Sequence, residues 1–145
     1  MLSTDNPFGE PFPETQFFTA RDGARIAFAK LGKTSKDDLI PPIIMVNGLS
    51  MIKKDFLTSI APVLALHTAV AVFDNRGLDE SKLPPGDPPF SVEDMAHDTL
   101  ELAQRLGWAG GPGFALVGVS LGGKIALAAA PSLQRESKRF NPRLA

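Results

Sequence analysis

Apolar residues fall into short runs along the chain, and three runs have the length and composition of buried strands. They are residues 43–46 (IIMV), 69–73 (AVAVF) and 114–119 (FALVGV). A run that is apolar at nearly every position is typical of a strand covered on both faces, as in a parallel sheet. Two further runs flank Asp22 and Gly23, a dipeptide that favours a hairpin turn. The pattern predicts an amino-terminal hairpin followed by three parallel strands.

Helical patterns alternate with these strands. Apolar residues recur near helical spacing over residues 55–66, and a second helical pattern begins after Ser91, with Asp94 completing a capping-box pattern. A third segment, rich in small residues, extends to Ala130. Strands that alternate with helices predict the α/β class, here a partial sheet with flanking helices.

The two ends of the chain depart from this pattern. Residues 1–13 hold three prolines and little periodicity, which predicts an extended arm. Residues 131–145 hold four basic residues and one acidic residue, with few apolar ones, which predicts an irregular basic tail. The expected domain therefore covers residues 14–130.

Composition excludes several classes of protein. The 145 residues suffice for one domain, and 43% hydrophobic with 21% charged residues is ordinary for a soluble chain. A net charge of −1 gives no electrostatic case for nucleic acid or an anionic membrane. Without cysteine there is no disulfide or thiolate metal site, and we expect neither metal nor cofactor. No run is long enough to span a membrane and the start has no signal-peptide pattern, so we expect a cytoplasmic protein.

The candidate chemistry lies at residues 118–122 (GVSLG), which match the pattern G-x-S-x-G between an apolar strand and a helix. A nucleophile at such a turn has a strained backbone, and Gly118 and Gly122 let strand and helix pass closely. The N–H of Leu121, at the helix start, would face a developing oxyanion. The pattern predicts Ser120 as a nucleophile; the alternative is a glycine-rich turn with an incidental serine.

The same segment also fits a second interpretation, that of a nucleotide-binding loop. Gly118, Gly123 and Lys124 fit the first seven positions of the phosphate-binding pattern G-x-x-x-x-G-K, and the run ending at Asp74 looks like the strand that holds Mg²⁺ in nucleotide-binding proteins. The eighth position should be Ser or Thr but is Ile125. A degenerate nucleotide binder is therefore a minor alternative.

Three segments in order, within residues 15–130, resemble the α/β-hydrolase family. In the first, the strand at residues 43–46 is followed by NGLS, where Gly48 matches the family glycine and Asn47 stands in place of the usual histidine. The resemblance implies that the backbone N–H of Leu49 is a second oxyanion donor. The elbow at Ser120 is the last of the three segments.

The middle segment, FDNRGLDES, is similar to the family loop D-x-R-G-x-G-x-S. Its matching residues are Asp74, Arg76, Gly77 and Ser81, and Asp79 replaces a glycine. Aspartate tolerates positive φ better than most residues. The resemblance implies a mostly parallel sheet of strand order 1-2-4-3-5-6-7-8, of which this chain carries the amino-terminal half. It also implies attack by serine on an ester, lactone, thioester or similar bond of a small acyl substrate.

The resemblance also implies a histidine base and an acid after the serine in sequence. The two histidines, His67 and His97, both precede Ser120, and Glu136 is the one carboxylate residue after it. His97 lies in the second predicted helix, on an acidic face typical of solvated helices, and His67 ends the preceding helix. We therefore expect a serine hydrolase that is truncated and nearly inactive as given; the alternative is a non-enzymatic isoform or interaction module.

Overall fold

The computed structural model describes residues 11–33, 40–110 and 113–140. Its elements are β1 (Gln16–Thr19), β2 (Arg25–Leu31), β3 (Ile43–Val46), α1 (Lys53–Leu57), α2 (Ala61–Leu64), β4 (Val70–Phe73), α3 (Val92–Arg105), β5 (Ala115–Gly118) and α4 (Leu121–Phe140).

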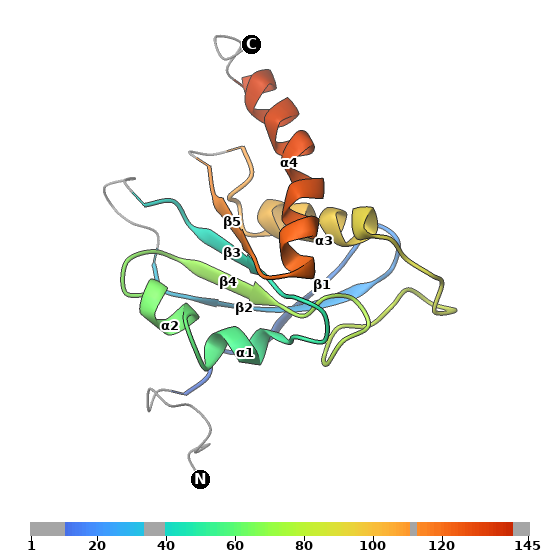
Figure 1. The fold of residues 1–145 in the computed structure, drawn as a ribbon, viewed down its shortest axis with the longest axis horizontal. Coiled ribbons are helices and arrows are strands. Elements are labelled where there is room, and N and C mark those ends of the chain that lie inside the picture. The colour runs from blue at the N-terminus through green and yellow to red at the C-terminus, as the bar shows by residue number, and fades with distance from the viewer. Residues whose placement is uncertain (1–10, 34–39, 111–112, 141–145) are drawn as a thin grey trace.

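The five strands form one mixed sheet in the order β1-β2-β4-β3-β5 (Figure 1). β1 pairs with β2, and β2 with β4, in antiparallel fashion, whereas β3 is parallel to both β4 and β5. The predicted hairpin and three parallel strands are confirmed, and so is the α/β class. The order of these strands is also the one that the resemblance implies for the first five.

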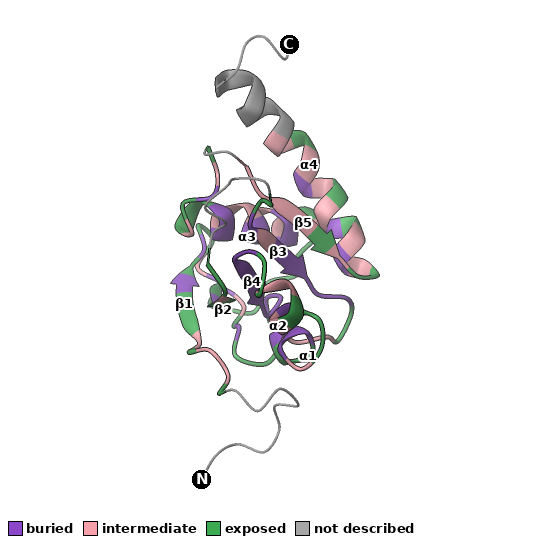
Figure 2. Cartoon of the chain, turned by 90° about the vertical axis from the view of Figure 1, so that its left-hand side faces the viewer, coloured by how far each residue is buried: buried purple, intermediate pink, exposed green. Residues whose placement is uncertain are grey.

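Helices cover both faces of the sheet, with α1 and α2 on one side and α3 and α4 on the other (Figure 1). Side chains of β3 alternate between the two faces, as the pleat requires. Ile44 and Val46 belong to the larger core with α3 and α4, whereas Met45 belongs to the core with α1 and α2. Figure 2 shows β3 and β4 buried between these layers. Continuous apolar runs are explained by this two-sided burial.

The helix predicted over residues 55–66 is wrong in extent, because two short helices take its place. α1 ends at Leu57, and α2 begins at Ala61 with Pro62 in its first turn. Proline has no N–H and its ring clashes with the carbonyl four residues earlier, so a continuous helix would be broken at this point. In the first turn of a new helix the missing N–H costs nothing.

The segment after Ala130 differs from the expected irregular tail, because α4 continues through Pro131 to Phe140. Most residues beyond the proline are good helix formers. Pro131 deprives the carbonyl of Leu127 of its helical partner, and Leu127 is 75% exposed, so water can replace that bond.

Residues 1–10 of the predicted arm and 141–145 of the predicted tail lie outside the described residues, and the division at residues 13 and 130 stays a prediction. No described helix, α4 included, has the length and apolarity to cross a bilayer.

The strand that precedes Ser120 forms one edge of the sheet. β5 pairs with β3, and within the described ranges no strand pairs with its other side. Val117 and Val119 are 39% and 41% exposed, whereas every residue of β4 is buried. The candidate nucleophile is therefore carried at the end of an edge strand.

Candidate active site

Ser120 occupies the two-residue connection between β5 and α4 and is exposed. Its φ is +55°, in the left-handed region that non-glycine residues rarely adopt. This conformation costs on the order of 1 kcal/mol, so the packing of strand against helix must enforce it. The strained backbone expected at this serine is therefore present.

Glycines on both sides of Ser120 allow that packing. A Cβ on Gly118 would collide with the main chain of Gly122, and a Cβ on Gly122 would collide with the carbonyl of Val46 in β3. The helix thus begins directly against the sheet. Because these obstacles are backbone atoms, no side-chain rotation could make room for a larger residue.

The turn after β3 lies against the same elbow. A Cβ on Gly48 would lie 2.9 Å from the carbonyl oxygen of Val119 and 3.3 Å from the Cβ of Ser120. Gly48 therefore lets the loop that begins at Asn47 pass close beside Ser120. The structure brings together the two sequence segments that were predicted to form one site.

Two backbone N–H groups flank the serine without hydrogen bonds in the part of the chain that the structure describes. One belongs to Leu121, the first residue of α4, and the other to Leu49, which is 77% exposed at the tip of the turn. The turn itself is closed by a hydrogen bond of 3.2 Å from the Met51 N–H to the Gly48 carbonyl. Unpaired N–H groups of this kind can stabilise an anion.

A cavity of about 240 Å³ opens beside the turn and the elbow. Apolar side chains line most of it, together with the turn after β3 and the loop after β4. Its lining residues are Gly48, Leu49, Ser50, Asn75, Arg76, Gly77, Leu78, Leu83, Phe90, Met95 and Leu121. The cavity has the size and the lining for a small, mostly apolar group.

Asn47 stands where the resemblance implies a histidine, and its bonds explain how it fits. It is fully buried, and its side-chain amide donates to the carbonyl of Phe73 at 2.6 Å. Its own carbonyl accepts from the Asn75 side-chain amide at 3.2 Å. The Oδ1 atoms of Asn47 and Asn75 are buried without a hydrogen bond among the described residues. Asn47 thus joins the ends of β3 and β4.

Asp74, the first residue of the matched D-x-R-G segment, is fully buried and bonds to Lys53 twice. Its Oδ1 accepts from the Lys53 backbone N–H at 2.6 Å, and its Oδ2 accepts from the Lys53 ammonium at 2.9 Å. Sequence reasoning missed Lys53. The sequence carried little signal for it, because Lys53 lies before the helix predicted over residues 55–66 and only the structure begins α1 there.

Carboxylates of Asp74, Asp79 and Glu80 lie close enough together to be considered as ligands of a cation. The Lys53 ammonium already lies 2.6 Å from Glu80 and 3.7 Å from Asp79. Burial alone would lower the pKa of Lys53, but the carboxylates of Glu80 and Asp74 more than offset that effect and the pKa is raised. The cluster is accordingly an ion-pair network centred on Lys53.

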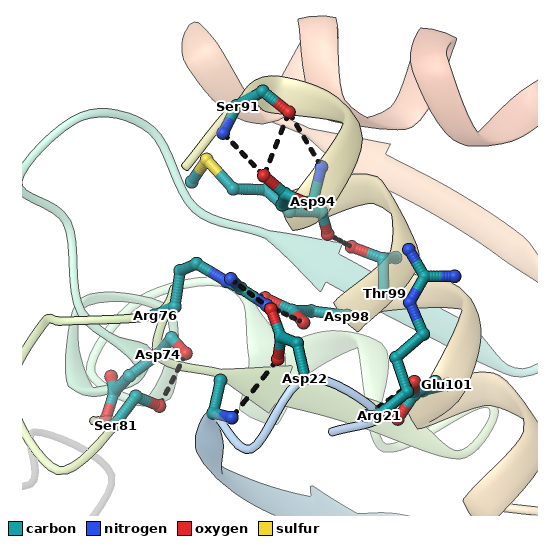
Figure 3. Close-up of polar contacts among 12 residues, drawn as sticks. Arg21, Asp22, Asp74, Arg76, Ser81, Ser91, Asp94, Asp98, Thr99 and Glu101 are labelled. Atoms are coloured by element: carbon teal, nitrogen blue, oxygen red, sulfur yellow. Dashed lines mark hydrogen bonds and ion pairs between the residues drawn. The ribbon is translucent and has the colours of Figure 1, made fainter. Parts of the chain in front are cut away.

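The rest of the D-x-R-G segment folds the loop back onto the sheet. Asp79 has φ +46° and Gly77 φ +78°, so the expected positive φ at Asp79 is confirmed. The Ser81 hydroxyl donates to the Asp74 carbonyl at 2.7 Å and accepts from the Ala27 N–H at 2.9 Å (Figure 3 shows the bond to Asp74). These contacts give the matched motif residues a structural role at the edge of the cavity.

Arg76 binds two carboxylates from distant segments (Figure 3). Its guanidinium donates twice to Asp98 of α3, both at 2.8 Å, and once to Asp22 of the hairpin turn at 2.8 Å. The bond from Arg76 lowers the pKa of Asp22, and burial raises the pKa of Asp98 against the opposing effect of Arg76. The buried pair fixes the loop after β4 to α3.

The two histidines do not contact the serine. His67 precedes β4, at the amino-terminal edge of the parallel strands, whereas Ser120 follows the carboxyl end of β5. His97 is half-buried on α3. Neither forms a hydrogen bond with Ser120 in the described ranges.

The capping box predicted at Ser91 and Asp94, at the start of α3, is confirmed.

The alternative phosphate loop does not form. In the pattern G-x-x-x-x-G-K the residues between the glycines must wrap around phosphate. Here α4 has begun at Leu121, so Gly122, Gly123 and the exposed Lys124 lie inside the helix. Ile125 is fully buried against the core. The segment lacks both the loop and the hydroxyl that nucleotide binding needs.

The ion pairs predict a stability that falls in acid. The bond from Lys53 lowers the pKa of Glu80, so the unfolded chain binds more protons than the folded chain once pH drops toward the ordinary value of 4.5. We expect Glu80→Gln to destabilise the protein at neutral pH, with the difference from wild type shrinking between about pH 6 and pH 3. Urea unfolding across this range measures it. A difference that stays constant with pH would contradict the assignment.

Comparisons with known proteins agree with this architecture. A profile of the alpha/beta hydrolase fold family matches residues 41–138. The chain superposes on an alpha/beta hydrolase from Sphaerobacter thermophilus with a TM-score of 0.67 and 29% identity, covering 81% of this chain and 40% of that one. A hydrolase from Pseudomonas aeruginosa gives 0.64 and 27%, covering 77% and 38%. A bacterial membrane phospholipase A, at 22% identity and a TM-score of 0.70, shares the fold, with 86% and 37% covered.

The chain spans about 40% of the length of these structures. No curated protein matches it significantly. The profile match covers more than half of the chain, and it includes β3, the loop after β4 and the turn at Ser120. The chain therefore belongs to the α/β-hydrolase fold family.

Proposed function

We propose that this chain carries the nucleophile and the oxyanion hole of a serine hydrolase. Ser120 is the nucleophile, and the N–H groups of Leu49 and Leu121 stabilise the oxyanion. The observation that supports this most directly is the φ of +55° at Ser120, which the close packing of Gly118 and Gly122 imposes. Backbone strain of this kind is concentrated at functional sites.

The reaction is acyl transfer to water. The Ser120 hydroxyl attacks the carbonyl carbon of an ester, lactone or thioester and gives its proton to a general base. The carbonyl oxygen becomes an anion that the two N–H groups stabilise, and the leaving group departs with a proton. Water then cleaves the acyl-serine bond. The cavity beside the turn fits a small, apolar acyl or alcohol group.

We assign neither the general base nor its acid to a residue that the structure describes. Neither His67 nor His97 bonds to Ser120, as described above. A serine without its base loses several orders of magnitude in rate. We therefore expect this chain alone to hydrolyse esters barely, and Ser120→Ala to change that residual rate little.

A fluorophosphonate probe tests the nucleophile without requiring turnover. The Ser120 oxygen attacks phosphorus, fluoride leaves, and added imidazole takes the hydroxyl proton as a general base. We expect imidazole to speed labelling of Ser120 at least about tenfold, less than the roughly 10²–10⁴-fold of a positioned side chain because free imidazole is not held in place. Intact mass and peptide mapping measure the adduct.

Ser59 supplies the matched comparison, because it is an exposed serine outside the elbow. The Ser59→Ala variant should be labelled like wild type, and the Ser120→Ala variant should show no imidazole-dependent adduct. Labelling of Ser120 no faster than that of Ser59 would overturn the proposed nucleophile.

A further inference from the structure

The turn at residues 48–52 presents the Leu49 N–H, but few bonds within the turn hold it. Ser50 has φ +60°, and the one backbone hydrogen bond that closes the turn joins Met51 to Gly48. Leu49 and Ser50 are both exposed. A loop of this kind needs external anchors to hold an N–H in a fixed direction.

Both ends of the turn are anchored on three consecutive residues at the end of β4. Before the turn, Asn47 donates to the carbonyl of Phe73 and accepts from the side chain of Asn75. After the turn, Lys53 holds the carboxylate of Asp74 through its backbone N–H and its ammonium. The residues at the end of β4 therefore hold both ends of the turn in place.

Lys53 is the more unusual of the two anchors. Its side chain is only 6% exposed, whereas the adjacent Lys54 is exposed. Burying an ammonium is unfavourable unless carboxylates neutralise it, and Asp74 and Glu80 do so at 2.9 and 2.6 Å. An anchor made of two charge-assisted bonds from one residue restricts both its backbone and its side chain.

We infer that Lys53 is a positioning residue, which fixes the turn at residues 48–52 on Asp74 and thereby sets the direction of the Leu49 N–H. The catalytic meaning of that direction rests on the proposed function. The anchoring of the turn does not, because it follows from the contacts of Lys53 with Asp74 alone. Positioning groups behind the reacting atoms commonly decide how well a site works.

Amide NMR spectra of the full chain test the anchoring. We expect Lys53→Met to shift or broaden the amide signals of residues 49–51, with those of β1 and β2 unchanged. Lys53→Arg, which keeps the charge and donors, should restore them in part. Lys54→Met is the matched control and should leave them as in wild type.

Asp74→Asn provides a second route in case Lys53→Met does not fold, since it removes the carboxylate and keeps the shape. It should perturb the same amide signals. Signals of residues 49–51 that match wild type in whichever of these two variants folds would overturn the inference.

The phosphonate reaction separates this inference from the proposed function. If both hold, Lys53→Met should slow imidazole-dependent labelling of Ser120 about 10- to 100-fold, as a misplaced donor would. If Ser120 is never labelled, the proposed function fails while the amide signals still decide the anchoring. If labelling is unchanged although those signals move, Lys53 anchors the turn but does not position the Leu49 N–H for the reaction, and the inference fails.

Discussion

Replacing Gly122 with alanine should lower the free energy of unfolding by about 3 kcal/mol, the upper end of what overpacking costs. The added Cβ would collide with the carbonyl of Val46 and lie 2.8 Å from the carbonyl oxygen of Asn47. Both obstacles belong to the main chain of β3 and the turn that follows. Relief therefore requires α4 to move away from the sheet, which also displaces Ser120.

Gly123 is the matched control for this substitution. It is the next residue of the same helix, and a Cβ there would meet no atom closer than the Gly118 carbonyl oxygen at 3.8 Å. Alanine is favoured over glycine within a helix by up to about 1 kcal/mol, so Gly123→Ala should stabilise the protein. Urea unfolding of both variants measures the contrast. Equal effects at the two positions would contradict the close approach of helix and strand.

Replacing Asp98 with alanine should cost about 3–5 kcal/mol, the usual penalty for removing one partner of a buried ion pair. The guanidinium of Arg76 would remain buried with Asp22 as its other carboxylate partner in the described part of the chain. The loop after β4 would also lose its attachment to α3. Because Arg76 lines the cavity, we expect the cavity to lose its shape as well.

Two comparisons isolate this effect. Glu93→Ala removes an exposed carboxylate from the same helix and should change the free energy of unfolding by about 0.5 kcal/mol or less. A double variant, Arg76→Met with Asp98→Leu, removes both charges and should recover much of the stability lost in Asp98→Ala. Chemical denaturation of the four proteins tests this. If the double variant were no more stable than Asp98→Ala, the buried guanidinium of Arg76 would not explain the destabilisation of Asp98→Ala.

The sequence determined the strands, because their signal is local. An apolar run such as residues 43–46 has no polar face to turn toward water, so it must be covered on both sides. The turn at Ser120 could be predicted equally well. Its pattern G-x-S-x-G contains Gly118 and Gly122, where a Cβ would collide with backbone atoms. The family match added the order of the strands.

The positions where helices end were harder to predict from the sequence than the strands. The apolar spacing over residues 55–66 continued past Pro62, although the structure forms two helices there and Pro62 lies in the first turn of the second, α2. At Pro131 the opposite happened, and α4 continued where an irregular segment was expected. In a first turn, as at Pro62, proline loses no helical hydrogen bond, whereas inside a helix, as at Pro131, it removes one, and the surroundings decide whether the helix continues.

Only the tertiary structure decided which charged residues face inward. Asp98 lies on the stripe of α3 that holds Met95 and Leu102, yet a carboxylate is buried there only because Arg76 arrives from a distant loop. Lys53 is buried for the same reason, since Asp74 comes from a different segment, directly after β4. Hydrophobic burial follows from the pattern of each segment, whereas a buried charge depends on a partner that the fold supplies. The sequence determined the sheet and the turn at Ser120, and the fold determined the ion pairs that hold the surrounding loops.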